Sequence, residues 1–502
     1  MTLRSLLAVA AVVLSVGSLA SADDRPNIIF VLVDDMGYSD LGCFGGEGQT
    51  PNLDRLAGEG VRFRQFYNGG KCEPTRSMII TGQYWPSVGL AGRGPTLGDV
   101  LSDAGYRTLA VGKWHLDGKP TDRGFDRYFG HLSGASPFFT VNDTWLLDDQ
   151  PFTKADAGEG FYATDAMGDY AIDFIREAVA EHADQPFLLY LAFNAPHDPL
   201  QAPEADVQRY LGKFMDGWDV LRERRVERMR TIGLIDDTWP IPERPEEVPA
   251  WDSLSDEAKQ VEDRRMAVYA AMIDRVDQNV GKVLTALDKL GIAENTLIVF
   301  MSDNGASPYD RVRAGIVGEP GSHWNHGLGW AYLANTPYRK FKRQQHMGGN
   351  LTAAIAHWPD GLRNPGRIDD TPLHVIDLMP TFLDLAGVDH AQDDAPCASF
   401  RPLLEDAPPP AEFGERALHF QLLDHGAVIS EGRKLVRANG GEWELYNLAA
   451  DRAETHDLIA THPALRDDLM ALYTTWFEAN DLRWNDGGPQ PDYRPIGEDA
   501  RE

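Results

Sequence analysis

The side chains best suited to chemistry follow directly on stretches of apolar residues. Four such stretches, residues 27–33, 108–111, 187–193 and 296–301, are followed in turn by Asp34 and Asp35, by Lys113 and His115, by His197, and by Asp303 and Asn304. Continuous apolar runs of this length are typical of strands buried on both faces of a parallel sheet. Ligands of open α/β sheets bind beyond the carboxyl ends of the strands, so we expect these side chains to converge on one site.

The acidic side chains in this set predict a metal site. Asp34, Asp35, Asp303 and Asn304 offer hard oxygen ligands, which suit Ca²⁺ or Mg²⁺ better than zinc. One acidic pair alone is more commonly a turn or a helix cap. Two such clusters at the ends of two buried strands favour a shared cation.

Cationic and protonatable side chains accompany these carboxylates. Lys113, His115, His197 and Arg76 would together stabilise a tetrahedral oxyanion, because fixed charges in a water-poor site act more strongly than in bulk water. A single His is more often structural and a single Lys more often solvated. Their common place at strand ends predicts a sulfate or phosphate group as the target.

The segment Cys72-Glu73-Pro74-Thr75-Arg76 gives the most specific signal. A flexible loop of Asn68-Gly69-Gly70 precedes it, Pro74 suits a first helical turn, and Gly82 suits a helix end. Cys72 is therefore expected at a helix N-terminus, where backbone N–H groups attract anions and favour a thiolate. Cys43 and Cys397 are interpreted as inert thiols.

The rest of the chain supplies the elements that must position these groups. Strand-like and helix-like stretches alternate through the first three quarters, and the candidate helices are residues 52–59, 97–104, 163–182 and 267–290. We predict an α/β fold with a large mixed, mostly parallel sheet sandwiched by helices. Short alternating runs between residues 417 and 446, then an amphipathic stretch at 463–479, predict a smaller C-terminal α+β domain of antiparallel strands and a terminal helix. The expected divisions are residues 1–22, 23–405 and 406–502.

The first of these divisions reads as a signal peptide. Arg4 precedes an apolar stretch at residues 6–16, and Ala20-Ser21-Ala22 forms a small-residue cleavage site. The product is expected to be exported, to the periplasm or the extracellular space, with no stable membrane insertion. The net charge of −30 argues against a nucleic-acid partner, although a local cationic pocket remains compatible with it.

At the Cys72 segment the chain resembles the sulfatase family, and most closely its arylsulfatase branch within the alkaline phosphatase superfamily. The family's Cys-x-Pro-x-Arg signature directs oxidation of the cysteine to formylglycine. Further matching motifs are Gly112-Lys113-Trp114-His115, Ala195-Pro196-His197, Ser302-Asp303-Asn304-Gly305 and Asn335-Thr336-Pro337-Tyr338-Arg339-Lys340-Phe341-Lys342. The resemblance extends over nearly all of the expected mature chain.

The resemblance implies a hydrolase that cleaves an organic sulfate monoester, aryl or carbohydrate, to an alcohol and sulfate. One Ca²⁺ would be held by Asp34, Asp35, modified Cys72, Asp303 and Asn304. Sulfate oxygens would be held by Arg76, Lys113 and Lys342. His115 would orient or deprotonate the formylglycine hydrate, and His197, with Lys342, would stabilise or protonate the leaving oxygen. A formylglycine-generating maturation enzyme is an implied partner.

The chain departs from the family pattern at two positions. Thr75 stands where Ser or Ala is common, and Met347 replaces the Glu of a usual Glu-Gly-Gly. If that Glu orients the neighbouring lysine, Lys340 becomes an alternative to Lys342. Two other functions are also weighed: a phosphate diester or phosphonate monoester hydrolase with the same metal site and nucleophile position, and a non-catalytic secreted binding protein that keeps the fold.

Overall fold

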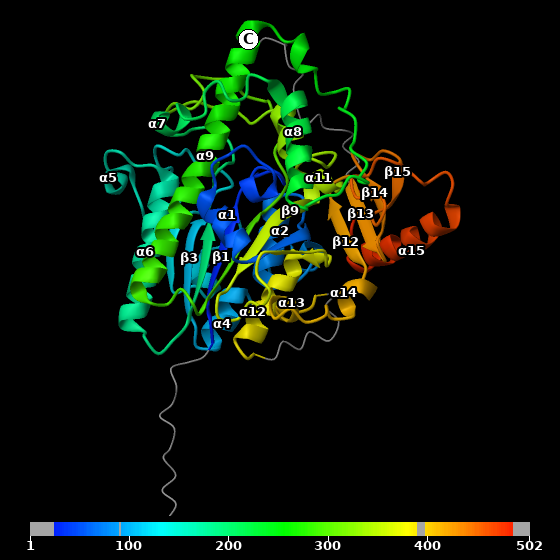
Figure 1. Ribbon diagram of the computed structural model, residues 1–502. Helices are drawn as coiled ribbons and strands as arrows, with labels where there is room; N and C mark the ends of the chain where they lie inside the picture. The colour runs from blue at the N-terminus through cyan, green and yellow to red at the C-terminus, as the bar shows by residue number, and fades with distance from the viewer. Residues whose placement is uncertain (1–24, 90–91, 389–396, 485–502) are drawn as a thin grey trace, which may run out of the picture.

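The computed structural model describes residues 25–89, 92–388 and 397–484, so the expected signal peptide lies outside the described residues (Figure 1). One large mixed sheet forms its centre. The strands, in spatial order, are β10 (Arg367–Asp369), β2 (Val61–Tyr67), β9 (Leu351–His357), β8 (Thr296–Ser302), β1 (Asn27–Val33), β7 (Phe187–Ala192), β3 (Arg107–Lys113), β4 (Arg127–His131), β5 (Trp145–Leu147) and β6 (Gln150–Pro151), with β11 (Leu373–His374) beside β2.

The four strands expected from the apolar runs are neighbours. β8, β1, β7 and β3 pair in parallel, so their carboxyl ends share one edge of the sheet. β9 is antiparallel both to β8 and to β2, which makes the sheet mixed. The predicted fold class is confirmed.

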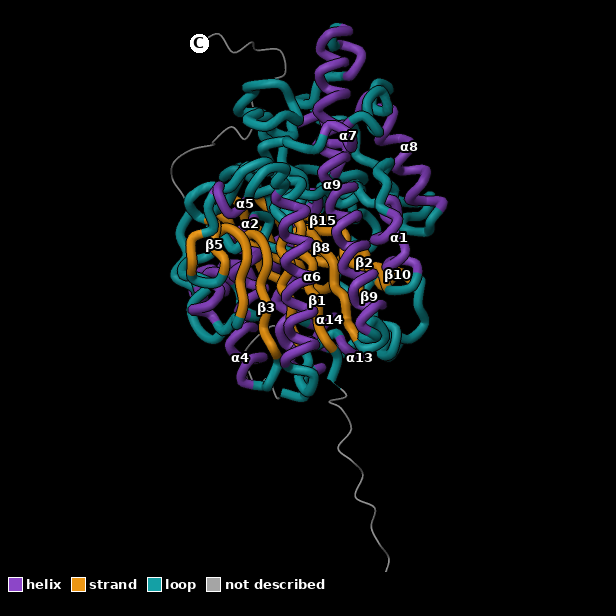
Figure 2. Tube along the Cα trace, turned by 90° about the vertical axis from the view of Figure 1, so that its left-hand side faces the viewer, coloured by secondary structure: helices purple, strands orange, loops and turns teal. Residues whose placement is uncertain are grey.

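Helices cover both faces of this sheet because alternate residues of a buried strand face opposite cores. In β1, Ile29 and Val31 pack in the core formed with α1 (Pro51–Gly58), α6 (Ala163–Glu181) and α9 (Asp256–Leu290). Ile28 and Phe30 pack in the second core, with α2 (Cys72–Thr81), α4 (Leu97–Asp103), α12 (Leu378–Leu385) and α13 (Arg401–Leu404). Figure 2 shows α6 lying across the face of the strands.

Shorter elements connect these layers. The remaining helices are α3 (Trp85–Val88), α5 (Lys154–Ala157), α7 (Glu204–Val207), α8 (Gly217–Thr231), α10 (Leu328–Ala334), α11 (Met347–Asn350) and α14 (Glu412–Glu415). Single 3₁₀ turns lie at Gly42–Phe44, Pro120–Arg123, Trp251–Ser253 and Val375–Asp377. Helix α9 is longer than the sequence pattern predicts, since it begins at Asp256 behind a Ser255 cap rather than at residue 267.

A separate antiparallel sheet follows near the C-terminus, as expected. It consists of β12 (Leu418–Leu422), β13 (His425–Ser430), β14 (Arg433–Arg437) and β15 (Trp443–Asn447), and α15 (Pro463–Ala479) packs on it. Val428, Leu435 and Tyr473 form its small core. In Figure 1 this sheet lies beside the large one, at the right of the view.

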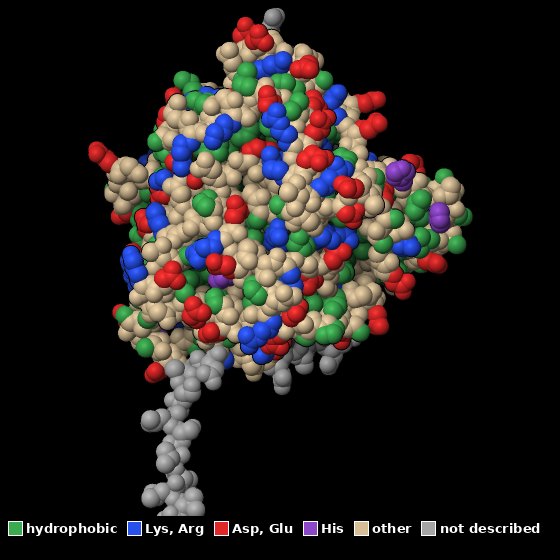
Figure 3. Space-filling model, in the orientation of Figure 1, with side chains coloured by type: hydrophobic (Ala, Val, Ile, Leu, Met, Phe, Trp, Pro, Cys, Tyr) green, Lys and Arg blue, Asp and Glu red, His purple; other side chains and the backbone are tan. Residues whose placement is uncertain are grey.

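The surface carries charges of both signs. Figure 3 shows acidic and basic side chains interspersed over one face, with no single basic tract across it. None of the helices within residues 25–89, 92–388 and 397–484 combines the length and apolarity that crossing a membrane requires.

Candidate active site

The predicted charged side chains meet at the shared edge of β8, β1, β7 and β3. Three buried ion pairs hold them together: Lys113 Nζ lies 2.6 Å from Asp34 Oδ2, Lys342 Nζ lies 2.5 Å from Asp35 Oδ1, and Arg76 Nη2 lies 2.8 Å from Asp303 Oδ2. Arg76 also donates to the carbonyl oxygen of Lys113. The cluster thus contains three carboxylates balanced by three cations, all removed from water.

Cys72 begins helix α2 at the centre of this cluster. Its thiol lies 3.3 Å from Asp34 Oδ1 and 3.3 Å from Lys342 Nζ, and the residue is only 2% exposed. The helix ends, as predicted, at Gly82, whose φ of 65° is a left-handed conformation that glycine tolerates. The helix N-terminus therefore points its free N–H groups at the same place as the cations.

Thr75 is compatible with this local structure. Its hydroxyl oxygen accepts a hydrogen bond of 2.9 Å from the backbone N–H of Gly69, and the residue is fully buried. The side-chain oxygen of Asn68 accepts a hydrogen bond of 2.8 Å from the backbone N–H of Gly70. The departure from Ser or Ala at this position thus keeps a hydroxyl that fixes the loop in front of Cys72.

The pKa values of Asp34 and of the Cys72 thiol are shifted in opposite directions. Although burial alone would raise it, Lys113 and the other cations hold the pKa of Asp34 well below its ordinary value. Burial, together with Asp303 and Asp34, raises the pKa of the Cys72 thiol well above its ordinary value. The expectation of a favoured thiolate is therefore wrong for the unmodified side chain: desolvation and two carboxylates outweigh the helix N-terminus.

His115 is held by Glu73, which was not among the predicted site residues. Its Nε2 lies 3.1 Å from Glu73 Oε1, and its buried Nδ1 has no hydrogen-bond partner among the described residues. Burial lowers the pKa of His115 to about 4, with Lys113 acting in the same direction. At neutral pH the imidazole is uncharged, so Nε2–H donates to Glu73 and Nδ1 keeps a free lone pair.

His197 is oriented with Nδ1 bound to the backbone and Nε2 directed toward the site. Its Nδ1 lies 2.6 Å from the backbone oxygen of Asp198, and its Nε2 faces Asp35 Oδ2 at 3.6 Å. The Asp198 carboxylate lies 3.2 Å from the same Nδ1. The Nε2 atom is therefore the one available to the site.

The oxygen atoms left without partners fit a bound cation. Asp35 Oδ2 and Asn304 Oδ1 are buried and accept no hydrogen bond from the described residues. Potential ligand atoms of Asp34, Asp35, Cys72 and His197 lie within 4.8 Å of one another. Orphaned buried oxygens are costly unless something binds them, which makes this donor set suitable for a metal ion.

Lys342 rather than Lys340 lies in the cluster. Lys342 is 3% exposed and contacts Asp35 and Cys72, whereas Lys340 is about a quarter exposed and points to Glu247 at 3.4 Å. Asp35 thus orients Lys342 without a glutamate at position 347.

A carboxylate of the C-terminal sheet region contacts the backbone at position 347. Met347 is buried in the core, and its backbone N–H donates to Glu454 Oε2 at 3.0 Å. The other oxygen of Glu454 pairs with Lys434 of β14 at 2.6 Å, and both side chains are fully buried. The segment after Lys342 is therefore fixed by a buried ion pair of the second sheet.

Two of the expected site residues have unusual backbone conformations. Asp35 has a φ of 65° and His115 a φ of 57°, both in the left-handed region that non-glycine residues seldom adopt. Such conformations persist only where surrounding contacts enforce them, and they cluster at functional sites.

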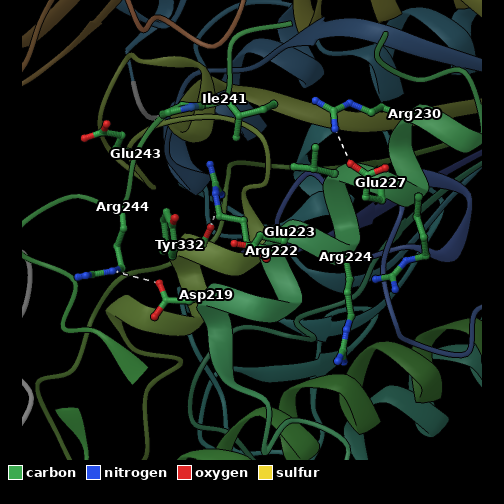
Figure 4. A pocket seen from close by; sticks show the side chains of 13 residues that line it. Asp219, Arg222, Glu223, Arg224, Glu227, Arg230, Ile241, Glu243, Arg244 and Tyr332 are labelled. Atoms are coloured by element: carbon green, nitrogen blue, oxygen red, sulfur yellow. Dashed lines mark hydrogen bonds and ion pairs between the residues drawn. The ribbon is translucent and has the colours of Figure 1, made fainter. Parts of the chain in front are cut away.

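A pocket elsewhere on the surface does not share these features. It measures about 850 Å³ and lies between α8 and the loop at residues 241–244 (Figure 4). Two ion pairs form within its lining: Arg244 with Asp219 at 3.1 Å, and Arg230 with Glu227. No residue of the buried cluster lines it.

Comparison with known proteins decides the family. The family model described as Sulfatase matches residues 26–388. The chain belongs to the sulfatase family. The match contains every residue of the buried cluster, and the predicted resemblance is confirmed.

Individual relatives agree with this assignment. An arylsulfatase of Klebsiella aerogenes is 32% identical over 78% of this chain and 92% of its own length. An uncharacterized sulfatase of Schizosaccharomyces pombe is 30% identical over 90% of this chain and 93% of its own. This sulfatase is accordingly a hydrolase of sulfuric ester bonds.

Solved structures show the same fold. The crystal structure of Ps i-CgsB in complex with k-i-k-neocarrahexaose has a TM-score of 0.68 at 25% identity, covering 92% of this chain and 95% of that one. The structure of BT4656 in complex with its substrate D-glucosamine-2-N,6-O-disulfate has a TM-score of 0.63 at 25% identity, covering 91% and 98%.

Proposed function

We propose that this sulfatase hydrolyses aryl or carbohydrate sulfate monoesters by means of a formylglycine formed from Cys72 and one Ca²⁺. The observation that carries the proposal is the placement of Cys72 between three buried ion pairs, beside unpaired oxygens of Asp35 and Asn304. Six charges arranged in this way are costly in a protein interior unless function requires them.

The assignment of metal ligands follows from the donor atoms. Asp34, Asp35, Asp303 and Asn304 would hold the ion, with the modified Cys72 as a further ligand. Replacing the thiol by oxygen would complete a set of hard donors, which is the kind that Ca²⁺ prefers. A divalent ion would also turn a neutral cluster of three acids and three bases into a cationic one, which matches an anionic sulfate ester.

The remaining residues have distinct roles in the proposed reaction. A hydrated formylglycine at position 72 would supply an oxygen nucleophile for sulfur, and a calcium ion held by the acidic residues would supply Lewis-acid charge. Arg76, Lys113 and Lys342 bind the sulfate oxygens and stabilise the charge that develops there. The free Nδ1 of His115 accepts a proton from the nucleophile, and protonated Nε2 of His197 donates one to the leaving alcohol oxygen.

The burial of Cys72 bears on its maturation. A side chain that is 2% exposed at the start of a packed helix is out of reach of another protein's active site. The proposed maturation enzyme must therefore act on Cys72 before the chain folds. Together with the signal-like residues 1–22, this supports modification before or during the proposed export to the periplasm or beyond.

Rates on matched esters test the reaction class. The purified protein should hydrolyse 4-nitrophenyl sulfate at least about tenfold faster than 4-nitrophenyl phosphate or its phosphodiester, a difference of ~1.4 kcal/mol in activation free energy. Peptide mass spectrometry of the Cys72 segment should show carbonyl oxygen in place of sulfur. Faster cleavage of the phosphorus esters would assign the protein to phosphate diester or phosphonate chemistry, and active protein carrying an unmodified thiol would exclude formylglycine.

Removal of divalent ions tests the metal. After treatment with a chelator we expect at least a tenfold loss of turnover and a lower melting temperature, since an ion at 100 times its Kd stabilises a fold by about 2.7 kcal/mol. Ca²⁺ should restore both properties better than Mg²⁺ or Zn²⁺. Unchanged melting and turnover after verified metal removal would mean that the unpaired oxygens serve another purpose.

A further inference from the structure

An exposed arginine lies at the rim of the site, in the loop that follows Asn304. The Arg311 guanidinium stacks on the ring of Tyr309, with Cζ 3.9 Å from the ring centroid. Lys342 Nζ lies 5.9 Å from the same centroid. The two distances place the Arg311 charge within about 10 Å of the buried lysine that contacts Cys72.

Hydrogen bonds connect this loop to the leaving-group side of the site. The side-chain oxygen of Asn325 accepts from the backbone N–H groups of Arg311 and Val312, at 2.9 and 3.0 Å. The amide of Asn325 donates in turn to Asp198, the residue that holds His197. The position of Arg311 is therefore fixed relative to the imidazole proposed to protonate the departing alcohol.

The charge of Arg311 has no carboxylate partner among the described residues. Its neighbours differ: Arg265 and Arg313 both bind Asp310, at 2.8 and 2.9 Å. What distinguishes Arg311 is its distance to the cluster, within about 10 Å of Lys342. A guanidinium that is fixed, exposed and unpaired is suited to bidentate binding of a carboxylate or sulfate.

We propose that Arg311 binds a second anionic group on the alcohol portion of the substrate, so that the enzyme selects polyanionic carbohydrate sulfates. The reacting sulfate would occupy the buried cluster, and a uronate carboxylate or a further sulfate on the sugar would reach Arg311. This inference rests on the proposed function, since it deepens the substrate choice of the same site.

Competition experiments test the inference directly. Three disaccharides carry the same reacting sulfate ester and differ only in a hydroxyl, a carboxylate or a second sulfate on the distal sugar. They serve as inhibitors of 4-nitrophenyl sulfate hydrolysis. Inhibition constants are obtained whether or not the sugars are cleaved. In the wild-type enzyme the two dianionic sugars should inhibit about tenfold better than the monoanionic one.

Variants of Arg311 test whether this residue causes the preference for dianionic sugars. R311A should abolish this preference, and R311K should restore it in part, because lysine keeps the charge but loses the bidentate geometry. Rising salt should reduce the preference of the wild type, whereas R311A should show no preference at any salt concentration. The control is R176A, an exposed arginine of α6 near the opposite edge of the sheet, which should keep the wild-type preference.

Each outcome has a defined meaning. Whichever dianionic sugar inhibits better identifies the second group as carboxylate or sulfate. Equal inhibition by all three sugars, or a preference that survives in R311A, overturns the proposal while leaving the proposed reaction intact. Failure to hydrolyse both 4-nitrophenyl sulfate and all three sulfated disaccharides by protein with verified formylglycine would instead overturn the proposed reaction, and this inference with it.

Discussion

Cys72→Ala should lower sulfate-ester turnover by at least about a thousandfold, because alanine has no thiol that can be converted to the proposed formylglycine. The fold should persist, since the change deletes one buried sulfur and adds no strain. Initial rates on 4-nitrophenyl sulfate measure the first effect, and thermal melting measures the second.

The chain provides matched controls for this variant. Cys43 and Cys397 are half-buried, and neither contacts the charged cluster. C43A and C397A should therefore retain turnover close to that of the wild type. Activity of C72A within about tenfold of the wild type would remove Cys72 from the mechanism.

The second large effect is expected at Lys342. K342A should reduce turnover by about a hundredfold or more, because it removes a fixed positive charge from a site without water. K340A, two residues away, should stay within a few-fold of the wild type, since Lys340 pairs with Glu247 outside the cluster. Steady-state rates on one aryl sulfate compare the two variants.

Melting temperatures must accompany these rates. Loss of Lys342 removes the short ion pair of the buried Asp35, so K342A is expected to be destabilised unless a metal ion compensates. A larger loss of turnover in K340A than in a folded K342A would show that the chain uses the alternative lysine suggested by its unusual Met347.

The strands and most of the cluster could be predicted because each is encoded locally. Each apolar run predicts a strand, and the Asp34, Lys113 or Asp303 near its end marks the carboxyl end of that strand. The parallel topology then brings the strand ends together. The Cys72 segment similarly carries its own helix start and its own glycine stop.

Contacts between distant segments could not be predicted in this way. Asn325 meets Asp198 across 127 positions, and no periodicity encodes that contact. The first eleven residues of α9 were missed because they present charges rather than an apolar stripe. There, Glu262 and Arg265 are buried as a pair with Asp310, so ion pairing replaces the hydrophobic signal on which helix prediction depends.

The hydrogen bond between the backbone N–H of Met347 and Glu454 couples the large sheet to the smaller one. Detaching the last eighty or so described residues, by proteolysis or by a shortened expression product, would strip an acceptor from the segment that carries Lys342. The smaller sheet therefore supports the large one, and we expect a trimmed chain to lose the alignment of Lys342 before it loses its central strands.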